Sequence, residues 1–213
     1  MRRFLILKLK GPMQAWGMHT FEGVRPSANI PTKSAVIGLL GACLGLRRND
    51  RGGLKKLIEG ICLAVRADQR ELSMEKITDY HTILDARKDY VGLKSHKNSI
   101  QTWREYLCDA EYTVAIWQSE RCEMPLESIA SAIKKPHFTP YLGRRSCPLA
   151  RPLFEQWVEA EDFSDALASI EPSAGVIYSD EDIGRGRPDI YRDAPLSDRP
   201  RQFGNRTVYV YGR

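Results

Sequence analysis

The segment at residues 141–149 holds the residues of this chain best suited to binding chemistry. Gly143 is followed by Arg144 and Arg145, and Tyr141 stands three residues before the first arginine. The planar guanidinium group of arginine matches phosphate oxygens and stacks on bases, tyrosine adds a stacking surface with a polar tip, and glycine lets the backbone approach a ligand closely. The pattern is typical of a loop that holds a nucleic-acid strand, although a solvated surface turn has the same composition.

A second segment, at residues 93–106, mixes basic, polar and aromatic residues in the same way. Trp103 alternates with polar residues there, and we expect it to pack inward. Stacking and phosphate contacts tolerate many sequences, so the segment fits nucleic-acid binding and ordinary surface equally well. Its candidate RNA-binding residues are Lys94, His96, Gln101, Thr102 and Arg104.

Two further sets of candidates follow the first expected strand. Gln14 and Trp16 can hydrogen-bond and stack with a splayed base, or Trp16 can be a core anchor. Thr32, Lys33 and Ser34 lie at an expected helix start, where free backbone N–H groups and the helix dipole favour phosphate. An ordinary helix cap explains the second set equally well.

The residues that could cleave RNA are sparse. Cleavage to a cyclic phosphate needs a base, an acid and a cation around one phosphate. The four histidines, at positions 19, 81, 96 and 137, are not paired at a recognisable spacing. The acidic run at residues 180–182 is typical of solvated surface, and the five scattered cysteines contain no Cys-x-x-Cys pair. The sequence therefore predicts no catalytic residue, no metal site and no cofactor.

Composition limits the class of protein. A chain of 213 residues with 42% apolar residues suits one large domain, or one domain with a small appendage. The net charge of +5 weakly favours an acidic partner, and the positive charge clusters near residues 94–97, 134–135, 144–151 and 185–206. The chain has no twenty-residue apolar run, so we expect no membrane span, and the cysteine pattern favours the cytoplasm.

Hydrophobic patterns predict an α+β fold. Strands are expected at residues 3–9, 61–66, 77–84 and 112–117, and helices at 36–45 and 126–135. This order is typical of a ferredoxin-like fold, which includes the RNA-recognition motif. Residues 86–108 are basic and polar and are expected to leave the sheet. Beyond residue 158 we expect a short helix at 163–170 and short strands at 176–178, 190–192 and 208–211.

Three glycines of the first expected helix, Gly38, Gly41 and Gly45, lie three and four residues apart. They form one small face, which can press closely on a sheet or a strand. Close packing is favoured over a ligand face for these glycines.

Several of these segments together resemble the CasD family, the subunit-five proteins of Cascade, which is the type I-E CRISPR surveillance complex. The combination in order is more specific than any one segment and extends from the first strand almost to the C-terminus. The segments that carry the resemblance are residues 11–17, 31–34 with 38–45, 79–84, 101–109, 139–149 and 200–203.

This resemblance implies an architecture and a role. It implies a ferredoxin-like, RNA-binding domain at residues 1–150 with a protruding thumb inserted at about 86–108, and a small β-rich C-terminal region at 151–213. It implies binding of the 5′ handle of the crRNA, with Tyr141, Arg144 and Arg145 gripping the handle. The implied partners are the backbone subunit, the large subunit and, through the assembled complex, target DNA. Relatives in another subtype cut RNA, so a metal-independent endoribonuclease that processes repeat RNA stays open beside the non-catalytic subunit.

Overall fold

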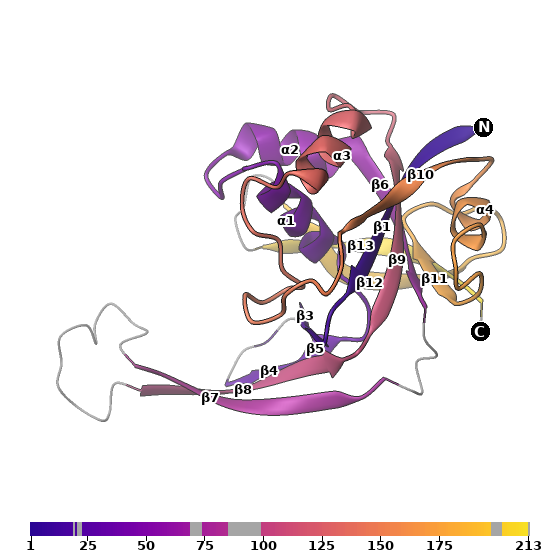
Figure 1. Ribbon diagram of the computed structural model, residues 1–213. Coiled ribbons are helices and arrows are strands. Elements are labelled where there is room, and N and C mark those ends of the chain that lie inside the picture. The colour runs from indigo at the N-terminus through magenta and orange to yellow at the C-terminus, as the bar shows by residue number, and fades with distance from the viewer. Residues whose placement is uncertain (19, 21–22, 69–73, 85–98, 197–201, 213) are drawn as a thin grey trace.

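The computed structural model describes residues 1–18, 20, 23–68, 74–84, 99–196 and 202–212. It is a mixed α/β fold built mostly of antiparallel sheets (Figure 1). The helices are α1 (Lys33–Cys43), α2 (Arg51–Gly60), α3 (Leu126–Lys134) and α4 (Phe163–Ala168). The strands are β1 (Arg2–Lys10), β2 (Met13–Gln14), β3 (Trp16–Gly17), β4 (Val24–Arg25), β5 (Ser27–Ala28), β6 (Ile61–Ala67), β7 (Lys76–Leu84), β8 (Ser99–Cys108), β9 (Glu111–Gln118), β10 (Phe154–Ala160), β11 (Val176–Ser179), β12 (Arg187–Pro195) and β13 (Phe203–Tyr211).

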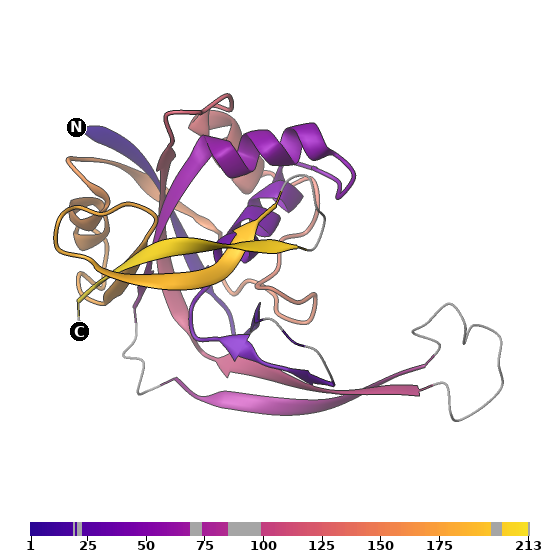
Figure 2. The same cartoon turned by 180° about the vertical axis from the view of Figure 1, so that it is seen from behind.

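The central element is a seven-stranded sheet in the order β10-β1-β9-β6-β11-β13-β12. Its neighbouring strands are antiparallel throughout. The region at residues 151–213 contributes four strands to this sheet, with β10 at one edge and β11, β13 and β12 at the other. The β12–β13 pair lies across the front of Figure 2. The C-terminal strands therefore continue the same sheet as the N-terminal half.

The alternation of side chains along β1 builds a core on each face of the sheet. Leu5, Leu7 and Leu9 pack with the buried faces of α1, α2 and α3. Phe4 and Ile6 point to the opposite face and pack with α4. Figure 1 shows α1, α2 and α3 together on one side of the sheet and α4 on the other. Both faces of β1 are buried, which explains its nearly continuous apolar sequence.

A long hairpin of β7 and β8 leaves the main sheet and extends beyond the body of the molecule (Figures 1 and 2). Strand β8 also pairs with β2 and β4, so the base of the hairpin belongs to a second, four-stranded sheet. The expected excursion at residues 86–108 therefore begins earlier, at β7, and its second half is a regular strand. Lys94 and His96 lie outside the described residues.

Local sequence signals predict most of the helices correctly. Thr32 caps α1, since its hydroxyl accepts a hydrogen bond from the Ala35 N–H, as expected. The predicted helix near 126–135 is confirmed as α3. Helix α2 is not predicted from the sequence, because Gly52 and Gly53 are poor helix formers, yet Asp50 caps it by accepting from the Gly53 N–H. Within the described ranges, no helix is both long and apolar enough to cross a membrane.

Candidate nucleic-acid interface

The loop at residues 141–149 is pressed onto the segment that follows β1. Within the loop, the Leu142 N–H donates to the Cys147 carbonyl at 2.8 Å. The Leu142 carbonyl accepts from the Ala15 N–H at 3.1 Å. Gly143 has φ +87°, and a Cβ atom at this position would overlap the Ala15 carbonyl. Glycine is therefore required at position 143 both by its backbone conformation and by the close approach.

Arg144 fastens this loop to the hairpin. Its guanidinium donates to the backbone carbonyls of Glu105 at 3.1 Å and Arg25 at 3.2 Å, and it stacks over the Tyr106 ring at 4.6 Å. Burial raises the pKa of the Tyr106 hydroxyl, but hydrogen bonds with Ser146 and Arg144 outweigh burial and leave the pKa below its ordinary value. The fork of Arg144 is thus largely engaged within the chain.

Arg145 is arranged differently. Its side chain is exposed and has no hydrogen bond or ion pair with the part of the chain that the structure describes. It lines a groove of about 670 Å³ between the loop and the hairpin, which we call the arginine groove. The groove is lined by Met13, Ile77, Asp79, His81, Arg104, Tyr106, Tyr141, Gly143, Arg144, Arg145 and Ser146.

The structure brings together five of the predicted site residues in this groove: Tyr141, Gly143, Arg144, Arg145 and Arg104. Arg104 reaches it from β8, where its Nε donates to the Thr102 hydroxyl at 3.0 Å. Thr102 itself is buried and positions Arg104, whereas Gln101 is exposed further along the hairpin.

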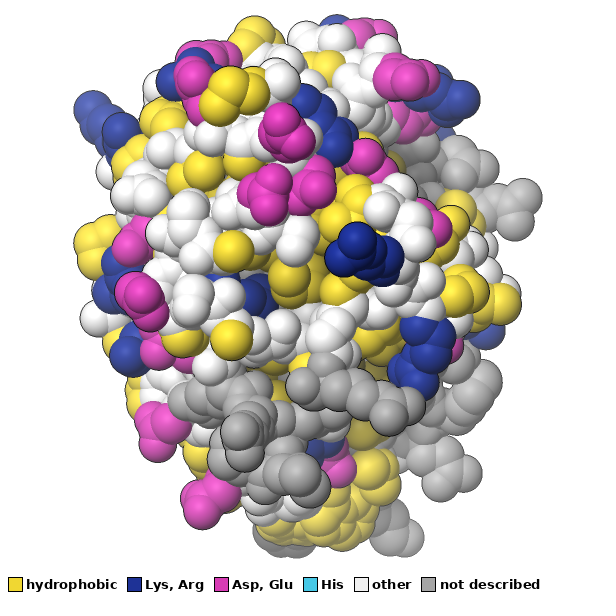
Figure 3. Space-filling view, turned by 90° about the vertical axis from the view of Figure 1, so that its right-hand side faces the viewer, with side chains coloured by type: hydrophobic (Ala, Val, Ile, Leu, Met, Phe, Trp, Pro, Cys, Tyr) yellow, Lys and Arg dark blue, Asp and Glu magenta, His cyan; other side chains and the backbone are white. Residues whose placement is uncertain are grey.

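Positive charge dominates the arginine groove. Three arginines line it, and the acidic residue among its lining residues is Asp79. Asp79 lies 3.7 Å from the Nδ1 atom of His81, and both side chains are about half exposed. By contrast, the side of the molecule that carries α4 intersperses acidic, basic and hydrophobic side chains (Figure 3). The groove thus offers a local concentration of cations suited to a polyanion.

The structure decides between the two interpretations of Trp16 and corrects the expectation for Trp103. Trp16 is 1% exposed and meets Tyr112 edge to face, so of its two interpretations the core anchor is the one the structure shows. Gln14 is also fully buried, and its amide donates to the carbonyls of Leu9 and Ala110. Neither can contact a strand at the surface. Trp103, expected to pack inward, is 44% exposed, because its face of β8 looks outward.

The start of α1 is already occupied by carboxylates from the C-terminal strands. Asp193 accepts from the Lys33 N–H at 2.6 Å, and Asp180 accepts from Lys33 Nζ at 2.6 Å. Arg206 donates to both acids and completes what we call the α1-start network, formed by Lys33, Asp180, Asp193 and Arg206. The hydroxyls of Thr32 and Ser34 lie 3.2 Å apart beside it. These contacts occupy the backbone N–H and the ammonium group of Lys33, which a phosphate at this helix start would need.

Sequence reasoning missed the role of Asp180. The acidic run at residues 180–182 is typical of solvated surface, yet the Asp180 side chain is only 9% exposed and joins two cations. Its partners lie 147 and 26 residues away along the chain, and local patterns carry no signal of such pairing. Among the described residues, no cluster of histidine, cysteine and acidic side chains is placed to hold a metal ion.

Comparisons with known proteins place these features in context. Residues 4–209 match the family model described as CRISPR-associated protein (Cas_Cas5). The chain is 51% identical over 216 residues to the CRISPR system Cascade subunit CasD of Escherichia coli (strain K12), covering 99% of this chain and 96% of that protein.

Two solved structures are similar along nearly the whole chain. A chain of a CRISPR RNA-guided surveillance complex has a TM-score of 0.75 and 28% identity, with 98% of this chain and 89% of that chain covered. A structure described as that of a Cas protein has a TM-score of 0.66 and 25% identity, with 98% and 93% covered.

Proposed function

The chain belongs to the Cas5 family of CRISPR-associated proteins, and we propose that it is a non-catalytic RNA-binding subunit of a Cascade complex that holds the 5′ handle of the crRNA. The observation that carries this proposal is the arginine groove, where Arg145 is exposed and has no partner among the described residues beside Arg104 and Tyr141. Arginines beside an aromatic ring suit a single strand, since the cations meet phosphates and the ring stacks on a base.

The strand order supports assignment of the main sheet to the ferredoxin-like class. Strands β10, β1, β9 and β6 are adjacent in that order, with α1 and α2 connecting β1 to β6 and α3 connecting β9 to β10. A split βαβ motif has this arrangement, and the RNA-recognition motif is one of its members. In this proposal β11, β13 and β12 are the additional C-terminal β region.

The β7–β8 hairpin is the segment we assign to the thumb of the family. It protrudes from the body and contributes Arg104 to the arginine groove (Figure 1). An arm that carries part of the RNA site and extends outward suits contact with a neighbouring backbone subunit. We propose that the protein closes one end of the complex through this arm, contacts the large subunit, and supports recognition of target DNA through the whole assembly.

A metal-independent endoribonuclease is the second candidate, because His81 faces the arginine groove with Asp79 beside it. General acid–base cleavage needs a second titratable group at the same phosphate. The Tyr106 residue is buried and its hydroxyl is 3.5 Å from Ser146. In the hairpin register Tyr106 pairs with Ile77, whereas His81 pairs with Thr102, four residues further along each strand. The spacing favours binding over catalysis.

The test uses the full chain and labelled CRISPR repeat RNA in a chelating buffer. We expect saturable binding with no cleavage product, and weaker binding for Arg145→Ala. Arg185→Ala is the matched control, because the Arg185 side chain is also exposed and makes no hydrogen bond or ion pair with the described residues, but lies outside the groove. Specific cuts that disappear in His81→Ala would establish the nuclease instead. An equal loss of RNA affinity in Arg145→Ala and Arg185→Ala would mean that the groove is not part of the binding site.

A further inference from the structure

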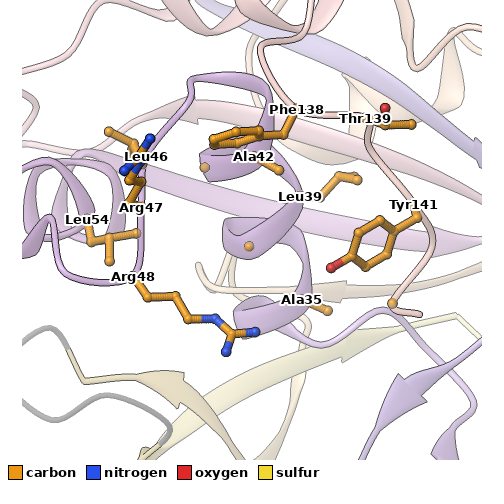
Figure 4. Close-up of a pocket in the computed structure, with 13 residues that line it drawn as sticks. Ala35, Leu39, Ala42, Leu46, Arg47, Arg48, Leu54, Phe138, Thr139 and Tyr141 are labelled. Atoms are coloured by element: carbon orange, nitrogen blue, oxygen red, sulfur yellow. The ribbon is translucent and has the colours of Figure 1, made fainter. Parts of the chain in front are cut away.

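The hollow between α1 and residues 138–143 lies beside the arginine groove and belongs to the proposed RNA-binding surface (Figure 4). It measures about 490 Å³, and Tyr141 and Gly143 line both it and the groove. Gly38 of α1 also lines it, and a Cβ atom there would meet nothing within 4 Å, so the expectation that this glycine packs closely is wrong. The outer edge of the main sheet at β10 is a separate surface, which shares no lining residue with the hollow or the groove.

Strand β10 is an edge of the seven-stranded sheet, where its partner in the described chain is β1. The pairing shifts at Glu155, which has no partner on β1, and the regular run is residues 156–160 opposite residues 2–6. Every second residue of this run directs its N–H and C=O groups away from β1. In the described part of the chain, no residue outside β1 hydrogen-bonds to the backbone of this run. The edge of β10 can therefore accept a further strand.

The opposite edge of the sheet, at β12, is blocked against such pairing. Pro188 and Pro195 carry no N–H, and the Ile190 N–H donates to the carboxylate of its neighbour Asp189 at 2.8 Å. Prolines and charged side chains on an edge strand are common devices against edge-to-edge association. Residues 156–160 contain no proline, so every backbone donor of that run is retained.

Charge along β10 is polarised. Lys134 and Lys135 lie at its start, where Lys134 Nζ is 3.9 Å from the centroid of the Phe154 ring. Glu159 lies near its end, on the same face as Trp157, which packs against the core that α3 shares. The side chains of both lysines and of Glu159 are exposed, and they make no hydrogen bond or ion pair with the described part of the chain. An added strand is favoured if it is acidic where β10 begins and basic where β10 ends.

A second copy of β10 that runs antiparallel to the first has this order of charges. We propose that two copies of the free chain pair through β10 about a two-fold axis and so extend the sheet across both molecules. The lysine end of each β10 then lies beside the glutamate end of the other, and the contact occurs twice. A parallel copy is disfavoured, because like charges would meet at both ends. The pairing does not depend on RNA, since these residues lie outside the arginine groove.

The experiment is sedimentation velocity of the full chain without RNA, over a range of protein concentrations at low salt. We expect the native chain to dimerise as its concentration rises, and to dissociate when salt screens the end-to-end charges. Lys134→Glu and Glu159→Lys each place like charges at both symmetric contacts, so each should weaken dimerisation about 10- to 100-fold. Mixed in equal amounts, the two variants should pair with each other at about native affinity, because both contacts then join an acidic and a basic side chain.

The matched control is Lys55→Glu, an exposed position on α2, which should dimerise like the native chain. A native chain that stays monomeric at all concentrations would overturn the proposal, as would two variants that dimerise with native affinity. Loss of dimers in both variants without recovery in the mixture would also refute the antiparallel arrangement.

Amide hydrogen exchange on the native chain tests the edge without any substitution. In the dimer, alternate amides of residues 156–160 should exchange more slowly than in the monomer, whereas the amides of β12 should not change. If residues 156–160 gain protection only in the complex with other subunits, while the free chain is monomeric, β10 docks another protein and the dimer is refuted. Lys134→Glu should keep native RNA affinity, so failure of the dimer and failure of the proposed RNA binding are distinguishable.

Discussion

The α1-start network and the arginine groove both contain cationic side chains, and the sequence makes one residue of the first, Lys33, and several of the second, Arg145 among them, candidates for phosphate binding. In the network, Lys33 and Arg206 are matched by Asp180 and Asp193, with side chains 15% exposed or less. In the groove, Arg145 is exposed and has no such partner among the described residues. The first arrangement holds the C-terminal strands onto α1, and the second leaves charge available to a ligand.

The same contrast separates two adjacent arginines. Arg144 donates to two backbone carbonyls and stacks on Tyr106, so it organises the loop. Arg145 has the same chemistry but lines the groove without an acceptor in the part of the chain that the structure describes. Residue type therefore identifies a possible phosphate ligand, and only the three-dimensional partners decide whether its charge is free.

The largest effect is expected for Asp180→Ala. This change leaves Lys33 and Arg206 partly buried without one of their carboxylates and removes the acceptor of the Leu63 N–H. Breaking a buried ion pair is costly, and we expect the free energy of unfolding to fall by about 3 kcal/mol. Urea denaturation measures it. Asp189→Ala, at an exposed position, should change it by less than about 0.5 kcal/mol, and equal losses in the two variants would contradict the structural role of the network.

Gly143→Ala should have the next largest effect on stability. The change costs about 1–2 kcal/mol for the left-handed backbone alone, and the overlap with Ala15 adds to that. Gly184→Ala is the matched control, because Gly184 has φ +89° and open space around it. The difference between the two melting temperatures isolates the close approach of the loop to the segment after β1. Identical melting temperatures would mean that the loop is not held there.

Arg144→Ala should lower the free energy of unfolding by about 1–2 kcal/mol, because two hydrogen bonds and a cation–π contact are lost. RNA affinity should fall as well, since the loop that carries Arg145 loosens. Arg145→Ala should leave the unfolding free energy unchanged within about 0.5 kcal/mol. Denaturation of both variants side by side checks this. If Arg144→Ala kept the native free energy of unfolding, neither arginine would stabilise the fold, and the distinction between them would be wrong.

Sequence patterns located the regular elements better than the contacts between them. Strands β1, β6 and β9 lie within one residue of their expected ends, because apolar runs between breaking residues mark buried strands. Strand β10 was missed, since its residues are only partly buried and mix charged with apolar types. Strand β8 was treated as part of a polar excursion, because its regularity comes from pairing with β7.

The candidate site was predicted in part. Tyr141, Gly143, Arg144 and Arg145 do share one groove, because they are neighbours in sequence and local spacing carries that information. The addition of Arg104 depends on how the hairpin folds back onto the loop, which no local pattern encodes. The choice between the two interpretations of Trp16 and the wrong expectation for Trp103 have the same cause, since the face of a strand that becomes buried is decided by distant partners.

The measurement that tests the central distinction most directly is the salt dependence of RNA affinity for the native chain, Arg145→Ala and Lys33→Gln. It is made on the full chain at a temperature where all three proteins are folded. A phosphate contact to a single strand contributes about 0.7 to the slope of log affinity against log salt. The account predicts that Arg145→Ala flattens the slope by about that amount and that Lys33→Gln leaves it unchanged. A flattened slope for Lys33→Gln with a native slope for Arg145→Ala would contradict it.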